Sequence, residues 1–209
     1  MRRRAAYRAI TAANNVCFVG DSVTEGTKNG GVPWYEPLEK LIKGKAINCG
    51  WGGATTKILL RDHLEEIIEA HADLYVFAIG ANDVRYRSEE CALTPEEYVD
   101  NLKELRQTII NSNPEAKFVF VSPWISTDGD QISALPYREK TAMTDEYTEA
   151  LKLWTMETGD LFVDANAYLR QYLERYPQSD YLIDYIHPNA TKGVELYSEA
   201  FLQVEDKEA

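Results

Sequence analysis

The chain has 209 residues, a length that one α/β domain commonly reaches and that can bury a core without disulfide support. Hydrophobic residues make up 44% and charged residues 27%, which is typical of a globular domain and excludes a disordered chain. The formal net charge of −12 is the opposite of the balance that a nucleic-acid-binding protein carries, and it disfavours anionic membranes.

The start of the chain predicts an N-terminal leader over residues 1–13, followed by a single domain over 14–209. Four arginines within the first eight residues make this leader basic, and no apolar stretch of a signal peptide follows it. We expect either a disordered tail or a helix that flanks a strand. No apolar run approaches the roughly 20 residues of a membrane span. Three cysteines cannot form a framework of pairs, so we expect reduced thiols and a cytoplasmic protein.

Five short apolar runs predict buried strands, each bounded by Gly, Asn, Asp or Pro. These runs are residues 16–19, 46–49, 74–79, 118–121 and 161–163. Strands that alternate with helices indicate a parallel sheet covered on both faces. The predicted fold class is therefore α/β, a three-layer α/β/α sandwich of flavodoxin-like type with a five-stranded parallel sheet.

Helical spacing between these runs predicts the covering layers. One amphipathic helix is expected over 58–71, and others over about 136–158 and 189–204. A further helix is expected from Pro95 to Asn113, because Thr94 and Glu97 have the spacing of a capping box.

Polar residues and glycines follow the first three strands, where open parallel sheets bind their ligands. Ser22, in GDSVTEG, opens a helix after a tight turn, a placement that suits a nucleophile or a helix cap. Gly53, in NCGWGGAT, can direct its backbone N–H at a substrate oxygen or form a plain turn. Asn82, in GANDV, can offer an amide donor or act as a turn residue.

A carboxylate and a histidine lie close together near the end of the chain, in DYIHPN. Asp184 can accept from one ring nitrogen of His187 and leave the other free to take a proton. A serine nucleophile needs such a base, and its tetrahedral intermediate needs hydrogen-bond donors. We therefore expect a triad of Ser22, His187 and Asp184, and an oxyanion hole formed by the N–H of Ser22, the N–H of Gly53 and the amide of Asn82.

These four blocks, in this order, resemble those of the SGNH (GDSL-type) hydrolase family, whose name lists Ser, Gly, Asn and His. The resemblance covers residues 20 to 189, with GDSV in place of GDSL. It implies a five-stranded parallel sheet flanked by helices. It also implies hydrolysis of esters or thioesters without a metal ion or other cofactor.

The expected substrate is a short acyl ester, acetyl above all, of a sugar or other small polar alcohol. Trp124, Trp51 and Trp34 are candidates for a flat surface under a sugar ring, or they pack within loops. Asp21 either contacts substrate or, like Asp83, shapes its turn. An O-acetyltransferase with the same triad, a lysophospholipase and a thioesterase are alternatives. A non-catalytic binding module is disfavoured, because every catalytic role has a candidate residue.

Overall fold

A five-stranded, all-parallel sheet in the order β2-β1-β3-β4-β5 organises the chain. The computed structural model describes residues 5–84, 93–129 and 135–203. Its strands are β1 (Asn15–Gly20), β2 (Lys45–Gly50), β3 (Leu74–Ala78), β4 (Lys117–Val121) and β5 (Leu161–Val163). This topology confirms the predicted α/β sandwich and its five strands.

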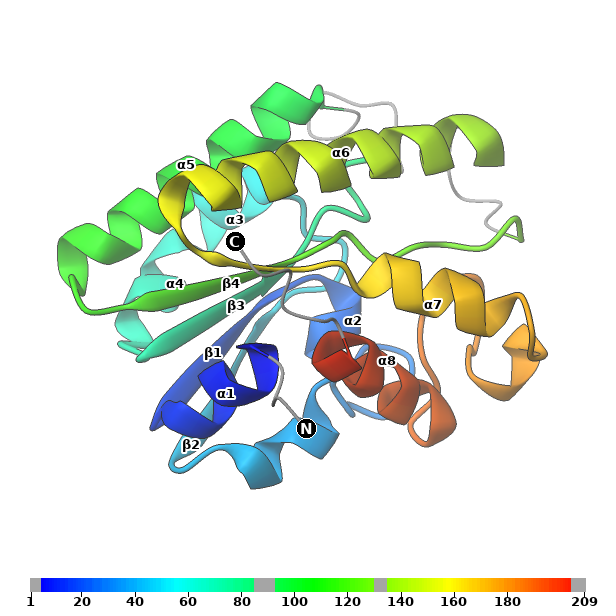
Figure 1. Cartoon of the computed structure of the whole chain (residues 1–209), viewed down its shortest axis with the longest axis horizontal. Helices are drawn as coiled ribbons and strands as arrows, with labels where there is room; N and C mark the ends of the chain where they lie inside the picture. Colours follow the sequence, from blue (N-terminus) through cyan, green and yellow to red (C-terminus); the bar gives the residue numbers. More distant parts are fainter. Residues whose placement is uncertain (1–4, 85–92, 130–134, 204–209) are drawn as a thin grey trace.

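Helices cover both faces of the sheet (Figure 1). On one face lie α3 (Thr56–Asp62), α4 (Leu64–Glu69), α5 (Pro95–Ser112) and α6 (Tyr137–Thr158); on the other lie α1 (Ala5–Ala12), α7 (Ala165–Leu173) and α8 (Lys192–Gln203). The short elements are α2 (Ser22–Glu25) and two 3₁₀ turns, η1 (Glu36–Leu41) and η2 (Gln178–Asp180). None of the helices in the described part of the chain combines the length and apolar character needed to cross a bilayer.

The ends of the first three strands lie level with one another. Gly20 of β1 is paired with Gly50 of β2 on one side and with Ala78 of β3 on the other. A Cβ on Gly20 would come within 2.2 Å of the Thr24 hydroxyl oxygen and 2.6 Å of the Ala78 carbonyl oxygen, so only glycine fits this close approach. The turns that follow these three strands therefore lie side by side at the same edge of the sheet.

The described part of the expected leader is mostly helical. Residues 5–12 form α1, and Ala6 and Ile10 are buried in the same cluster as Val16 and Phe18 of β1. Of the two expected conformations, the structure has the helix that flanks the sheet. Residues 1–4 lie outside the described residues, and the division of the chain at residue 13 stays a prediction.

The single helix expected over 58–71 is wrong, because the chain bends at His63 (φ −128°, ψ 7°) and forms two helices, α3 and α4. The hydrogen-bond ladder continues on both sides of the bend, where the His63 N–H donates to Leu59 O and the His63 carbonyl accepts from Ile67 N–H. Leu59 and Ile67 are buried in one cluster, so the apolar spacing is correct although the axis changes. The His63 ring stacks on Trp51, a partner that helical spacing cannot indicate.

Local capping signals place two other helices. Thr94 Oγ1 accepts from Glu97 N–H at 3.2 Å and Glu97 Oε2 accepts from Thr94 N–H at 2.8 Å, so the predicted capping box is confirmed. The final helix begins at Lys192 rather than 189. Asn189 lies before it, and its Oδ1 accepts from the backbone N–H groups of Thr191 and of Gly193 in the first turn of the helix. Its predicted end at 204 lies outside the described residues.

Candidate active site

The turn after β1 presents Ser22 at the start of α2. Asp21 is the N-cap of this helix, and its Oδ1 accepts from the backbone N–H of Val23 at 3.0 Å. Gly26 ends the helix in a left-handed conformation (φ 84°). The Asp21 side chain is buried, which supports its role in shaping the turn rather than contacting substrate.

Ser22, His187 and Asp184 form one hydrogen-bonded row, although the serine and the histidine are 165 positions apart. His187 Nε2 lies 2.8 Å from Ser22 Oγ, and His187 Nδ1 lies 2.9 Å from Asp184 Oδ2. The imidazole is buried. In this arrangement Nε2 can accept the hydroxyl proton of Ser22, while the Nδ1–H group of His187 keeps its hydrogen bond to the Asp184 carboxylate.

The loop that carries Asp184 supplies the donors that keep its carboxylate ionised. Oδ1 accepts from the backbone N–H groups of Ile186 at 3.0 Å and His187 at 2.9 Å, and Oδ2 accepts from Lys28 Nζ at 2.9 Å. Burial acts to raise the pKa of Asp184, but these donors and the neighbouring imidazole hold the pKa well below its usual range. The Tyr197 hydroxyl of α8 donates to the Ile186 carbonyl at 2.8 Å and fixes the loop from behind.

The other two expected oxyanion donors follow β2 and β3. Gly53 is exposed and has a left-handed backbone (φ 77°), and a Cβ there would meet no atom within 4 Å, so the space in front of it is open. Asn82 is buried, and its Nδ2 donates one N–H to the Ala54 carbonyl at 3.0 Å. That bond orients the amide, whose second N–H is available to a ligand. The convergence of Ser22, Gly53 and Asn82 on one oxygen atom stays a prediction.

A buried carboxylate ties the turn after β3 to the start of α3. Asp83 Oδ1 accepts from the backbone N–H of Thr56 at 3.0 Å and from its hydroxyl at 2.6 Å. Asn101 of α5 donates to the same hydroxyl oxygen at 2.9 Å. Complete burial raises the pKa of Asp83 to about 6, against the lowering effect of the Thr56 donors. The sequence suggested a turn role for Asp83 but gave no sign of Thr56 or Asn101, which join it only in three dimensions.

The tryptophans correct part of the substrate hypothesis. Trp34 and Trp124 are buried and pack edge to face with ring centroids 5.2 Å apart, so neither can lie under a sugar ring. Trp51 is half-buried, and one face of its ring stacks on His63 at 4.0 Å. This stacking leaves the His63 ring half-buried as well.

The thiols and acidic side chains that the structure describes show no metal-binding arrangement. Within residues 5–84, 93–129 and 135–203, no group of three or more His, Cys, Asp or Glu side chains is placed to hold a metal ion. Cys17 and Cys49 are buried in β1 and β2, and burial raises the pKa of the Cys17 thiol well above its ordinary value. Cys91 lies outside the described residues. Metal-free and cofactor-free chemistry stays a prediction.

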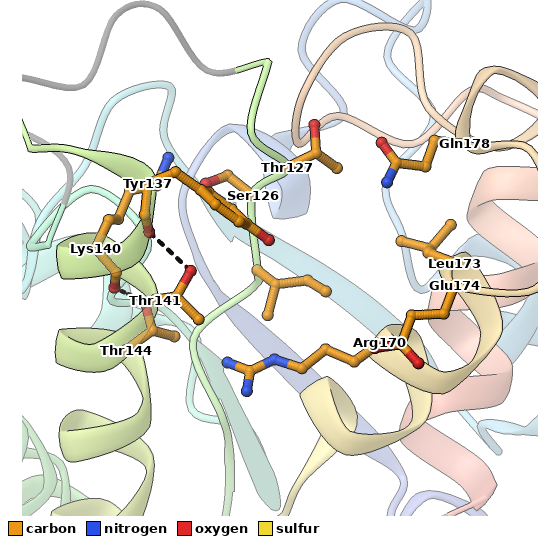
Figure 2. Close-up of a pocket in the computed structure, with 11 residues that line it drawn as sticks. Ser126, Thr127, Tyr137, Lys140, Thr141, Thr144, Arg170, Leu173, Glu174 and Gln178 are labelled. Carbon is orange, nitrogen blue, oxygen red and sulfur yellow. Dashed lines mark hydrogen bonds between the residues drawn. The ribbon is translucent and has the colours of Figure 1, made fainter.

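A cavity of about 340 Å³ with a mixed polar and apolar lining lies between α6 and α7 (Figure 2). Its polar lining includes Ser126, Thr127, Tyr137, Thr141, Arg170 and Gln178. Figure 2 shows the Tyr137 ring pointing into the cavity from α6 and Arg170 reaching across from α7 toward α6, where its Nη2 donates to Asp145 Oδ1. None of the expected catalytic or oxyanion residues lines it. The Thr127 N–H donates to the Tyr185 carbonyl at 2.8 Å, which joins the cavity wall to the loop of Asp184 and His187.

Comparison with known proteins identifies the class of this chain. The model of the GDSL-like lipase/acylhydrolase family matches residues 18–191, which include every block that the sequence analysis singled out. The protein is a carboxylic ester hydrolase. The chain belongs to the GDSL-like lipase/acylhydrolase family, which confirms the resemblance drawn from its motifs. A search of curated proteins by sequence finds no match.

Solved structures share the fold at low sequence identity. A catalytic mutant of an acetylxylan esterase from Geobacillus stearothermophilus is 21% identical with a TM-score of 0.71, over 91% of this chain and 93% of that one. A protein from Parabacteroides merdae described as a GDSL-like lipase is 19% identical with a TM-score of 0.73, over 90% and 94%. An α/β hydrolase from the metagenome of Lake Arreo, Spain, is 21% identical with a TM-score of 0.68, over 91% and 94%.

Proposed function

We propose that this protein is a serine esterase that removes a short acyl group, acetyl above all, from a sugar or other small polar alcohol. The observation that carries the proposal is the row in which Ser22 Oγ lies 2.8 Å from His187 Nε2 and His187 Nδ1 lies 2.9 Å from Asp184. A hydroxyl is a weak nucleophile at neutral pH, and this arrangement supplies both its base and the orientation of that base.

Two half-reactions complete the cycle. As Ser22 Oγ bonds to the acyl carbon, its proton passes to His187 Nε2, and the carbonyl electron pair moves to the oxygen. The N–H groups of Ser22 and Gly53 and the amide of Asn82 are the proposed donors to that oxyanion. When the oxyanion collapses, the C–O bond to the alcohol breaks and the alcohol leaves with the proton from His187. A water molecule then repeats the steps and releases the acid and the free serine.

Asp184 makes this cycle possible across the neutral pH range. Its lowered pKa keeps it ionised, so it stabilises the imidazolium that forms in each transition state. Protonation of His187 before substrate binds removes the base. We therefore expect activity to fall as the pH drops through the range around 6.5 in which histidine side chains usually titrate.

Two observations support a small acyl group on a polar alcohol. The cavity beside the catalytic loop has hydroxyl groups of Ser126, Thr127 and Thr141 and the amide of Gln178 among its apolar walls, and these groups can hydrogen-bond a small hydroxylated alcohol. One structural neighbour is an acetylxylan esterase. We expect p-nitrophenyl acetate to be cleaved faster than the decanoate ester, and a preference for decanoate would overturn this part of the proposal.

The nucleophile is tested by Ser22→Ala. We expect p-nitrophenyl acetate turnover to fall by about 10³-fold or more, because the attacking oxygen is lost while the fold remains. Ser112→Ala, at the exposed end of α5, is the matched control and should keep full activity. Circular dichroism of both variants checks the fold. If Ser22→Ala keeps more than a few per cent of activity, the assignment is wrong.

The same residues can pass the acyl group to a sugar hydroxyl instead of water. Product analysis separates the two reactions: acetate marks hydrolysis, and an acetylated sugar marks transfer. We expect acetate to predominate when an acetyl ester is incubated with a free xylo-oligosaccharide acceptor.

A further inference from the structure

The loop between α2 and η1 holds a lysine in a conformation that suits glycine. Residues Gly26, Gly30 and Gly31 have φ values of 84°, 84° and 86°, and Lys28 has a φ of 68°. A left-handed conformation strains a residue with a Cβ, whereas glycine adopts it freely. Strain of this kind persists where the side chain has a use that other residues in the loop do not supply.

The Lys28 side chain reaches the proposed catalytic row. Its Nζ donates to Asp184 Oδ2 at 2.9 Å, and the same oxygen lies 2.9 Å from His187 Nδ1. One carboxylate oxygen therefore accepts from an ammonium and from the imidazole together. Asn29, the next residue, donates from Nδ2 to the Pro188 carbonyl at 3.2 Å. The strained loop is thus attached on both sides of His187.

We infer that Lys28 is a positioning residue for the proposed triad, which fixes Asp184 Oδ2 and uses its positive charge to keep His187 unprotonated at lower pH. This inference rests on the roles proposed above for Ser22, His187 and Asp184. A carboxylate that already neutralises one cation stabilises a second cation less. The active form of the base is the neutral imidazole, so Lys28 extends the pH range of activity to lower pH.

Other ionisable groups face this pair from the elements packed around it. Asp21 comes from the turn after β1, and Tyr197 comes from α8, where the charges of Asp21 and Asp184 help to raise its pKa. Tyr185 lies beside Asp184 in the loop, with its ring 6.0 Å from Lys28 Nζ. The Asp184 carboxylate favours a protonated His187, and the positive charge of Lys28 acts in the opposite direction.

The test is the pH dependence of kcat/KM for p-nitrophenyl acetate from pH 4.5 to 8.5 in the full chain. In Lys28→Met, which keeps the length and loses the charge, we expect the acid midpoint to rise by about half a unit. That shift corresponds to an approximately threefold loss of activity at the acid end of the range. It is the size expected when a charge is removed that is separated from His187 by two hydrogen bonds, through Asp184, at a partly exposed site. Lys28→Arg should restore most of the wild-type profile.

Two further variants separate the charge from the backbone. Lys28→Gly removes both the ammonium and the strain, so it should resist denaturation at least as well as wild type and still show the shift of Lys28→Met. Lys103→Met removes an exposed ion pair with Asp100 on α5 and should leave the profile unchanged. If the midpoints of Lys28→Met and wild type agree while Ser22→Ala is inactive, the inference on Lys28 fails and the proposed function stands. Activity in Ser22→Ala would instead overturn the proposed function itself.

Discussion

Two loops at the edge of the sheet each contain an aspartate, and the two carboxylates respond to the protein in opposite ways. Asp184, in the loop before α8, accepts from two backbone N–H groups and from Lys28, and these donors lower its pKa despite partial burial. Asp83, in the turn after β3, is completely buried and accepts from Thr56, and burial raises its pKa to about 6. The loss of water acts on both groups. The number and charge of the donors decide which effect prevails.

The two environments also suit different tasks. An ionised carboxylate beside His187 can stabilise a positive charge that forms during a reaction. A buried carboxylate bonded to Thr56 joins β3 to α3, and both elements adjoin the segments that carry Gly53 and Asn82. The difference predicts that changes at Asp184 mainly affect activity and that changes at Asp83 mainly affect stability.

The largest effect is expected from Asp184→Asn. An amide can no longer stabilise the imidazolium, so we expect kcat/KM for p-nitrophenyl acetate to fall by about 10²–10⁴-fold at pH 8. Asp180→Asn, an exposed acid in the same region, is the control and should stay within twofold of wild type. An Asp184→Asn variant with more than a tenth of wild-type activity would contradict the assigned role.

The next effect is a difference in the sign of the pH dependence of stability. The lowered pKa of Asp184 means that its charge stabilises the fold above the unfolded pKa of about 3.9, and that this contribution is lost as the pH falls through the folded value. The folded pKa of Asp83, about 6, exceeds the unfolded value. Its ionisation between about pH 4 and 6 therefore weakens the fold as the pH rises.

Urea unfolding at pH 4.5 and 7.5 separates the two carboxylates, because only the contribution of Asp83 changes within this interval. Asp83 destabilises the wild-type fold as the pH rises from 4.5 to 7.5, and Asp83→Asn lacks this effect. The free energy of unfolding of Asp83→Asn, measured against that of wild type, should therefore be about 1–3 kcal/mol more favourable at pH 7.5 than at pH 4.5. Asp184→Asn should keep a nearly constant difference from wild type over the same interval, because Asp184 is ionised in both the folded and the unfolded state above about pH 4.5. Equal slopes for the two variants would show that their environments do not differ as described.

The smallest effect concerns the support of Asp83. Asn101→Ala removes the donor to the Thr56 hydroxyl oxygen, and we expect a loss of about 1 kcal/mol, the usual net value of one hydrogen bond. Asn111→Ala, on the exposed side of the same helix, should change the free energy of unfolding by less than about 0.5 kcal/mol. Equal losses in the two variants would remove Asn101 from the network.

Local signals in the sequence were sufficient for the strands, the capping box at Thr94 and the row of Ser22, His187 and Asp184. Each depends on short spacing, or on the rule that the ends of parallel strands share one edge. The chemistry of ester cleavage supplied the remaining link, because a serine needs a base and the base needs an acid beside it. This is why residues 165 positions apart could be paired without coordinates.

Features that depend on packing between distant segments were not predictable. An aromatic ring in a loop looks the same in sequence whether it is exposed or, like Trp124, packed against Trp34 and Tyr197. The ring of His63, at the bend between α3 and α4, stacks on Trp51, which lies 12 positions earlier. Lys28 and Asp184 are 156 positions apart in the sequence, and no short motif predicts their contact.

The distance in sequence between the hydroxyl and the imidazole has a consequence during synthesis. The hydroxyl follows the first strand, and all five described strands leave the ribosome before residue 187 does. A nascent chain can therefore complete its sheet while it still lacks a base. If His187 is the base, as proposed, we expect a nascent chain to stay inactive toward esters until residue 187 has been added and folded onto the sheet.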